Sequence, residues 1–110
     1  MTAWTYILRC ADGTYYVGST IDLHNRLAAH KQGLGAAYTK RRLPVELVWS
    51  CDFERVEDAF ALEKSIQGWS HAKREAFIDG GVAAIRRWSD AHPSRSDRRV
   101  TRGRRPAGDA

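Results

Sequence analysis

The chain of 110 residues has the length of one domain, with 43% hydrophobic residues and a formal net charge of +5. It contains no run of about 18 apolar residues, which excludes a membrane-spanning helix, and its first residues lack the pattern of a secretory signal. The two cysteines, Cys10 and Cys51, show no C-x-x-C spacing, so the sequence gives no sign of a zinc site or a redox motif. These features predict a cytoplasmic protein with a packed core.

The chain opens with a predicted β-hairpin. Residues 4–10 are rich in aromatic and β-branched side chains and end at turn residues, which predicts a strand. Asp12 and Gly13 form a dipeptide typical of a tight hairpin turn, so residues 15–17 are expected to return as the second strand. Residues 18–20, with the sequence Gly-Ser-Thr, are expected to form a turn after it.

Helices make up most of the remaining predicted elements. The first runs from Asp22, a suitable N-cap, to about Lys31. A loop is predicted over residues 35–42, and residues 45–51 alternate well enough to form a third strand. Apolar residues then recur at helical spacing until a glycine pair interrupts them, which predicts helices over residues 56–68, 71–79 and 82–90.

This order of elements, ββαβαα(α), predicts an α/β (α+β) fold with a small three-stranded antiparallel sheet flanked by helices. We expect the folded domain to cover residues 1–90. Residues 91–110 hold six arginines against two aspartates and very few apolar side chains, which predicts a disordered, Arg-rich C-terminal tail. Such a tail suits an anionic partner such as nucleic acid, although a purely solubilising role fits the composition equally well.

Charge is also uneven within the predicted domain. Residues 1–45 hold six Lys or Arg against two Asp, whereas residues 46–90 hold six against nine Asp or Glu. A surface that binds an anion is therefore expected in the N-terminal half.

The hairpin and the first helix carry the most distinctive polar residues. The hairpin presents Tyr6 on its first strand and Tyr15 and Tyr16 on its second. Arg26 and His30 lie four residues apart on one face of the helix, where a guanidinium fork and an imidazole could bind a phosphodiester. The same residues also fit a solvated helix face and the core of a small sheet, and both interpretations remain open.

These residues stand in an order that resembles the GIY-YIG nuclease signature. The segment Trp4-Thr5-Tyr6 is similar to the first half of the signature but keeps only its tyrosine, and Tyr16-Val17-Gly18 is similar to the second half. Arg26 and His30 follow at the separations of that family, as does Glu63 within the next predicted helix.

Two further segments, residues 33–41 and 63–78, resemble the small stand-alone bacterial members of the family, which are described as predicted endonucleases. The resemblance covers about residues 4–80. Larger members carry an asparagine late in the domain, and residues 70–90 contain none, which is consistent with the small subgroup.

The resemblance implies hydrolysis of phosphodiester bonds with one divalent cation, Mg²⁺ or Mn²⁺, and with Glu63 as its protein ligand. Arg26 would neutralise a phosphate oxygen as charge builds on it, and His30 would bind phosphate or orient a tyrosine. A tyrosinate would accept a proton from the attacking water, with Tyr16 favoured over Tyr6. Because a free tyrosine has a pKa near 10, Arg26, the cation and other basic neighbours are expected to lower that pKa.

The loop over residues 35–42 combines cations with an aromatic ring, which can track a phosphate backbone and stack a base. The residues expected to contact nucleic acid are Tyr38, Lys40, Arg41 and Lys73. The predicted function is a metal-dependent endonuclease for single-stranded or branched DNA in repair or recombination, and the residues do not distinguish DNA from RNA. Two alternatives are a nucleic-acid-binding module without turnover and a small interaction protein whose tail binds a partner.

Overall fold

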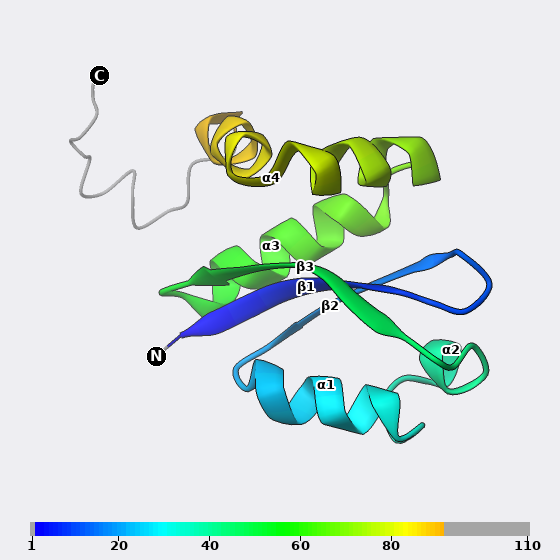
Figure 1. Cartoon of the computed structure of the whole chain (residues 1–110). Helices are drawn as coiled ribbons and strands as arrows, with labels where there is room; N and C mark the ends of the chain where they lie inside the picture. The colour runs from blue at the N-terminus through cyan, green and yellow to red at the C-terminus, as the bar shows by residue number, and fades with distance from the viewer. Residues whose placement is uncertain (1, 92–110) are drawn as a thin grey trace. The chain divides into compact units, whose positions relative to one another are not determined.

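A computed structural model describes residues 2–91 and shows a three-stranded antiparallel sheet with helices, which confirms the predicted fold class (Figure 1). The predicted tail lies outside the described residues apart from Ala91, and the domain boundary at residue 90 stays a prediction. In chain order, the elements are β1 (Ala3–Arg9), β2 (Tyr15–Thr20), α1 (Leu23–Lys31), α2 (Ala37–Lys40), β3 (Glu46–Phe53), α3 (Val56–Gln67) and α4 (His71–Ala91).

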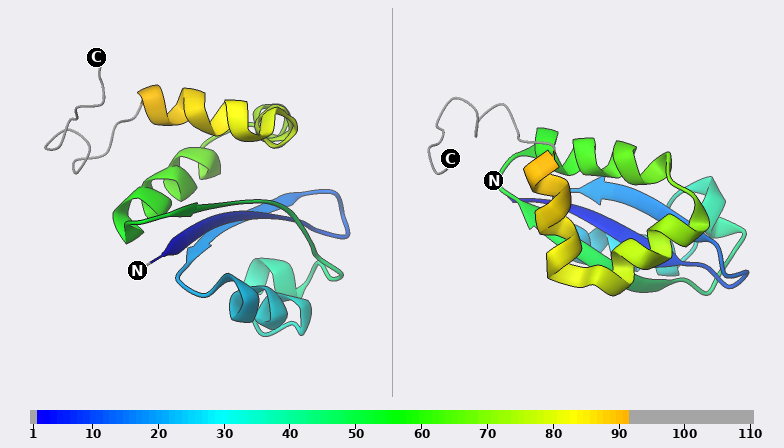
Figure 2. Two further views of the ribbon diagram at one scale, coloured as in Figure 1. Left: turned by 60° about the vertical axis from the view of Figure 1, so that its left-hand side comes forward. Right: turned by 90° about the horizontal axis from the view of Figure 1, so that it is seen from above.

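The sheet has the order β2-β1-β3, so β1 lies in the middle and β2 forms an edge. Figures 1 and 2 show α1 and α2 on one face of the sheet and α3 on the other. Alternation along β1 separates the two faces. The Thr5 hydroxyl donates to the Ala59 carbonyl of α3 at 2.7 Å, whereas Tyr6 belongs to the core cluster against which Leu23 and Leu27 of α1 pack.

The predicted hairpin is confirmed, but its second strand is longer than expected. Asp12 accepts hydrogen bonds from the backbone nitrogen and the hydroxyl of Thr14, at 3.1 and 2.6 Å, and thereby fixes the turn. Residues 18–20, predicted as a turn, instead continue β2 and pair with residues 4–6 of β1. Pairing with a strand already held in the sheet outweighs the turn preference of Gly, Ser and Thr.

The first predicted helix is confirmed, and the loop after it contains a helical turn that the sequence did not reveal. Asp22 is the N-cap of α1, and its carboxylate accepts from the Asn25 backbone nitrogen at 3.2 Å. In the predicted loop, the Lys40 backbone nitrogen donates to the Ala36 carbonyl at 3.0 Å and closes the turn α2. A single turn is too short to show an apolar period, so a pattern-based prediction misses it.

The predicted helices after β3 are present as α3 and α4. Ala59, Leu62 and Ile66 form the buried face of α3, as their spacing predicts. The break predicted at the glycine pair is present as a kink within α4 at Gly81, whose φ of 56° and ψ of −132° are not helical. The chain divides into two compact units after Ile78, and every site residue described below belongs to the first unit. None of the described helices is long and apolar enough to cross a membrane.

Candidate active site

The site is built on the pairing of Tyr6 in β1 with Gly18 in the edge strand β2. The two residues are register partners, and the tyrosine ring lies close over the glycine. A Cβ atom at position 18 would lie 2.5 Å from the Tyr6 oxygen, so any larger residue would displace the phenol. The glycine of Tyr-Val-Gly is therefore required by the position of Tyr6, which joins the two halves of the sequence motif in space.

A buried chain of hydrogen bonds runs from Tyr6 through His30 to Thr39. The Tyr6 hydroxyl lies 2.8 Å from His30 Nε2, and His30 Nδ1 lies 2.9 Å from the Thr39 hydroxyl. Because the Thr39 hydroxyl donates its own proton to the Ala36 carbonyl, at 3.0 Å, it accepts from His30 Nδ1. The network thus assigns His30 as a neutral histidine with its proton on Nδ1. Its Nε2 accepts a hydrogen bond from the Tyr6 hydroxyl.

His30 is fully buried, which excludes for this residue the solvated helix face that the sequence left open as an alternative. The backbone at Gly35 passes so close to the imidazole that a Cβ atom there would collide with the ring. Burial lowers the pKa of His30, and the positive charge of Arg26 lowers it further. Of the two roles expected for His30, binding phosphate and orienting a tyrosine, these contacts agree with the second.

The pKa values of Tyr6 and Tyr16 are raised, whereas the sequence predicted that their neighbours would lower them. Burial raises the pKa of Tyr6, and the charges of Tyr16 and Glu63 raise it further, against a lowering effect of Arg26. Burial likewise raises the pKa of Tyr16, with the Glu63 carboxylate adding to the increase and Arg26 opposing it. The lowering effect of Arg26 is present but is smaller than the effect of burial, and the further lowering expected from a bound cation stays a prediction.

Tyr16 lies at the centre of an aromatic cluster. Its ring centroid lies 5.1 Å from that of His30 and 6.2 Å from that of Tyr38, whose ring is inclined to it by 30°. The Arg42 guanidinium lies 3.8 Å from the centroid of the Tyr38 ring and pairs with Asp12 at 3.0 Å. Tyr38 is thus brought to the site, with its ring already in contact with two other groups.

Glu63 reaches the same edge of the sheet from the opposite face. Its half-buried carboxylate accepts from the Ser19 hydroxyl at 2.5 Å and from the Gln67 side-chain amide at 2.8 Å. The Gln67 amide also donates to the Val17 carbonyl of β2 at 3.4 Å. Because the Glu63 charge acts on both Tyr6 and Tyr16, the carboxylate and the two phenols belong to one electrostatic site.

Arg26 is exposed on α1, and no carboxylate among residues 2–91 with described side chains pairs with it. The charge of Arg26 opposes the rise in the pKa of both Tyr6 and Tyr16, which places it beside the other four residues of the expected catalytic set: Tyr6, Tyr16, His30 and Glu63. Its guanidinium is available to an anion at the solvent side of this set.

The residues predicted to contact nucleic acid are not all placed alike. Tyr38 lies in the aromatic cluster, while Lys40 and Arg41 are exposed at the end of α2. The Lys73 ammonium lies 4.6 Å from the centroid of the Trp69 ring. Of these four residues, Tyr38 alone lines the groove described next.

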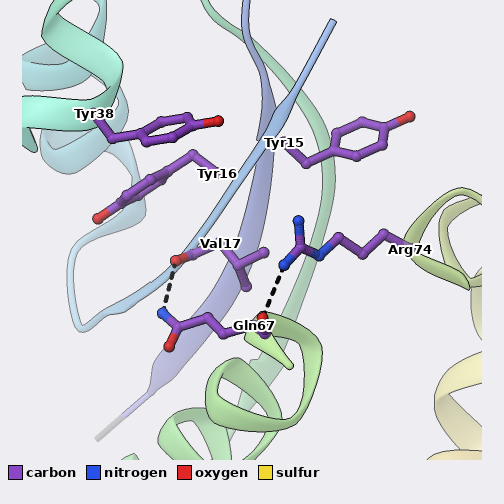
Figure 3. A pocket seen from close by; sticks show the side chains of 6 residues that line it. All are labelled: Tyr15, Tyr16, Val17, Tyr38, Gln67 and Arg74. Carbon is purple, nitrogen blue, oxygen red and sulfur yellow. Dashed lines mark hydrogen bonds between the residues drawn. The ribbon is translucent and has the colours of Figure 1, made fainter. Parts of the chain in front are cut away.

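A shallow, open groove of about 220 Å³ crosses β2 beside this site. In Figure 3, Tyr16 and Tyr38 lie on one side of the strand, and Tyr15 and Arg74 lie on the other. The groove is lined by Tyr15, Tyr16, Val17, Tyr38, Gln67 and Arg74.

Sequence reasoning missed several residues that the structure places at the site. Gln67 follows Glu63 by one helical turn, so the spacing alone could have suggested their contact. The sequence predicts a turn at Ser19, and it indicates Lys73 rather than Arg74 as a contact for nucleic acid. Thr39 left no local signal, because its contact with His30 depends on how the chain folds back after α1.

The fold and the site agree with the comparison to known proteins. The sequence model of the GIY-YIG catalytic domain matches residues 2–76. The chain therefore belongs to the GIY-YIG family, the class of nuclease domains to which this fold and this arrangement of residues correspond.

Within that class, the similar proteins are small ones. A UPF0213 protein of Streptococcus pneumoniae serotype 4 is 41% identical over 76 residues, which cover 69% of this chain and 77% of the relative. A UPF0213 protein of Halobacterium salinarum is 42% identical over 73 residues, covering 66% of this chain and 95% of the relative. The solution NMR structure of the protein EF2693 from E. faecalis superposes with a TM-score of 0.52 at 32% identity, covering 72% of this chain and 84% of that chain. The chain is thus a GIY-YIG-type protein that is similar to small members of the family.

Proposed function

We propose that this protein is a metal-dependent endonuclease that hydrolyses phosphodiester bonds in DNA, acting on single-stranded or branched DNA in repair or recombination. The observation that carries the proposal is the position of Tyr16 at the edge strand between Arg26, whose charge lowers the Tyr16 pKa, and Glu63, whose charge raises it. A cation, a carboxylate and a phenol around one solvent-facing point are the groups that a hydrolytic phosphodiesterase requires. The two cysteines are free thiols, which is consistent with action in the cytoplasm.

The donor atoms near Glu63 fit a hard divalent cation such as Mg²⁺ or Mn²⁺. They are carboxylate oxygens and the Ser19 hydroxyl, and each carboxylate oxygen accepts one hydrogen bond and keeps a lone pair for a further ligand. Among the described residues, no group of three or more His, Cys, Asp or Glu could hold a metal ion. One carboxylate suits a cation that keeps most of its waters.

A divalent cation held by Glu63 would supply positive charge beside the leaving oxygen and would offset the carboxylate charge that raises the Tyr16 pKa. Arg26 binds a non-bridging oxygen of the phosphate, since its guanidinium is exposed and has no described carboxylate partner. Tyr16, in its deprotonated tyrosinate form, accepts the proton of the attacking water, because its ring lines the open groove while Tyr6 is buried. Tyr6 and His30 form a fixed pair behind Tyr16.

The raised tyrosine pKa values favour one alternative, a nucleic-acid-binding module without turnover. A phenol with a raised pKa stays protonated at neutral pH and is a poor proton acceptor. A module of this kind would use Arg26 for phosphate binding and would have no need of the carboxylate at position 63. Removal of that carboxylate therefore separates the two functions.

The test is incubation of the pure protein with labelled single-stranded, duplex and branched DNA, in Mg²⁺, Mn²⁺ or EDTA. We expect cleavage in the presence of metal and its loss in EDTA. Glu63→Ala should lower the cleavage rate by roughly 10²–10³-fold or more while leaving DNA binding in place. Glu57→Ala, which removes an exposed carboxylate from the same helix, serves as the matched control and should cleave like the wild type.

Two results would contradict the endonuclease proposal. Equal cleavage by Glu63→Ala and wild type would indicate a contaminating nuclease. Binding of DNA without cleavage under any metal condition would favour the binding module.

A further inference from the structure

The groove across β2 has a shape and lining that suit a segment of chain lying over it. Its volume of about 220 Å³ is smaller than the roughly 300–1,000 Å³ of pockets that enclose small molecules, and it is open to solvent. Tyrosine rings form its walls, and Arg74 is the charged residue in its lining. The combination fits an elongated, anionic ligand that rests on aromatic walls.

Arg74 is held rigidly from behind. Its Nε donates to the Ile66 carbonyl at 3.1 Å, and its Nη2 donates to the Gln67 carbonyl at 2.9 Å. These carbonyls belong to the last turn of α3, and that of Ile66 also accepts from the Trp69 backbone nitrogen at 3.0 Å. Figure 3 shows the guanidinium between Tyr15 and Gln67, directed toward β2.

The charge of Arg74 is not neutralised within the described part of the first unit. Its chain neighbour Glu75 lies 3.7 Å from His71 and accepts from the Tyr15 hydroxyl at 3.5 Å. Glu63 is engaged by Ser19 and Gln67. An arginine that is fixed in place, faces an open groove and has no carboxylate partner among the described residues is a good receptor for a phosphate.

Arg26 and Arg74 then flank one strand. Arg26 acts on Tyr16 from α1, and Arg74 lines the groove that Tyr16 also lines. Gln67 connects the groove to Glu63 through its hydrogen bond. A nucleic acid strand whose scissile phosphate lies at Arg26 and Glu63 would have a neighbouring nucleotide in this groove.

We propose that the groove is a nucleotide subsite in which Arg74 binds the phosphate next to the one that is cut, while Tyr38 contacts the intervening nucleoside of a single strand. The inference rests on the proposed function for the choice of ligand and for the position of the phosphate that is cut. Lys73, the adjacent cation, lies over Trp69 and does not take part. Arg74 is therefore the phosphate contact on α4.

Binding in EDTA tests this proposal without any need for cleavage. The probe is fluorescein-labelled dT10, whose dissociation constant is measured by anisotropy at several salt concentrations. Arg74→Gln should weaken binding about tenfold and lower the slope of log K against log salt by about 0.7, the value for one phosphate contact on a single strand. Lys73→Gln removes the same charge one residue away and should weaken binding by less than about twofold. Equal effects of the two variants would overturn the proposal.

Two further measurements separate charge from structural support. Arg74→Lys keeps the charge but cannot make both hydrogen bonds to α3, so we expect a nearly unchanged salt slope even if its melting temperature falls. A reduced slope in Arg74→Lys would show that the residue acts through the fold and would overturn the proposal. This variant also serves if Arg74→Gln does not fold.

A chain of ten abasic deoxyribose phosphates carries the phosphates of dT10 without its bases. Tyr38→Ala should weaken binding of dT10 about tenfold and leave binding of the abasic chain nearly unchanged. If Tyr38→Ala weakened the binding of both ligands equally, or of neither, the nucleoside would not lie in the groove. Cleavage lost in Glu63→Ala together with normal binding by the groove variants would sink this inference alone. Loss of binding in the groove variants of a protein that never cleaves would sink the proposed function alone.

Discussion

The two faces of the edge strand β2 carry polar networks of opposite character. On the face of α1 and α2, the chain from Tyr6 through His30 to Thr39 is buried, and each of its polar atoms has a partner. On the face of α3, the chain from Ser19 through Glu63 to Gln67 is partly exposed. The first network is closed to ligands, whereas the second keeps lone pairs that a ligand can use.

Because of this difference, we expect the buried network to stabilise the fold and the exposed network to serve binding and catalysis. A buried network that loses one member leaves a polar atom without a partner in a medium of low dielectric, so its loss costs stability. An exposed network can replace a missing partner with water, so its loss costs function instead. Tyr16 lies between the two networks. Its ring packs against the imidazole of His30, and the Glu63 carboxylate charge raises its pKa.

The largest difference between the two networks is expected from two tyrosine variants, one of which should lose activity and the other stability. Tyr16→Phe should lower the cleavage rate by roughly 10²–10⁴-fold, as expected for loss of a proton acceptor, and leave the free energy of unfolding within about 0.5 kcal/mol. Tyr6→Phe should cost about 1–3 kcal/mol of stability because it leaves His30 Nε2 without a donor. Urea unfolding and single-turnover cleavage measure both quantities. If Tyr6→Phe proved stable and inactive while Tyr16→Phe remained active, the assignment of the proton acceptor would be reversed.

Replacing the histidine should expose how much the closed network stabilises the fold. His30→Leu removes the partners of both Tyr6 and Thr39, and we expect a loss of about 2–4 kcal/mol in the free energy of unfolding. His24→Leu, at an exposed position on the same helix, should change it by less than about 0.5 kcal/mol. Similar urea midpoints for the two variants would show that the buried network contributes no more than a surface histidine.

Acid should weaken the closed network selectively. Burial lowers the pKa of His30 in the folded state, so below its ordinary value of 6.5 the unfolded chain binds a proton that the folded chain does not. Stability is therefore fully present above pH 6.5 and is lost as the pH falls below it. Urea midpoints between about pH 8 and 5 should fall in the wild type, and His30→Gln should reduce that fall. A His24→Gln variant that reduced it as much would place the titration elsewhere.

The smallest effect is expected from the arginine-rich segment outside the described residues. Removing residues 91–110 should weaken DNA binding and reduce its salt slope, by up to roughly 0.7–0.9 for each phosphate that this segment binds. The hydrogen bonds at β2 should persist, so single-turnover cleavage at saturating protein should not change. An unchanged salt slope would show that this segment does not bind DNA.

Much of this arrangement could be predicted because it depends on local patterns. The Asp12 turn, the Asp22 cap and the apolar face of α3 are each set by a few neighbouring residues, and all three are found in the structure. The spacing of Arg26 and His30 correctly placed both on one helix. It could not reveal that one is exposed and the other buried, because Gly35 and the following turn cover His30 from outside the helix.

The net direction of the tyrosine pKa shifts could not be predicted from the sequence, for a related reason. The residues themselves suggested a lowering by Arg26, which is present. Burial depends on the packing of both faces of the sheet, and it is the larger cause. The roles of Gln67 and Arg74 likewise depend on where α3 ends beside β2, and no local pattern records that position.

An edge strand is also a place where a second polypeptide can add itself to a sheet, since its outer backbone groups are free to pair. The Gln67 amide occupies the Val17 carbonyl of β2 and so takes one of the acceptors that an added strand would need. The same side chain holds the Glu63 carboxylate. One glutamine therefore both holds the Glu63 carboxylate and limits the pairing of this edge strand with another chain.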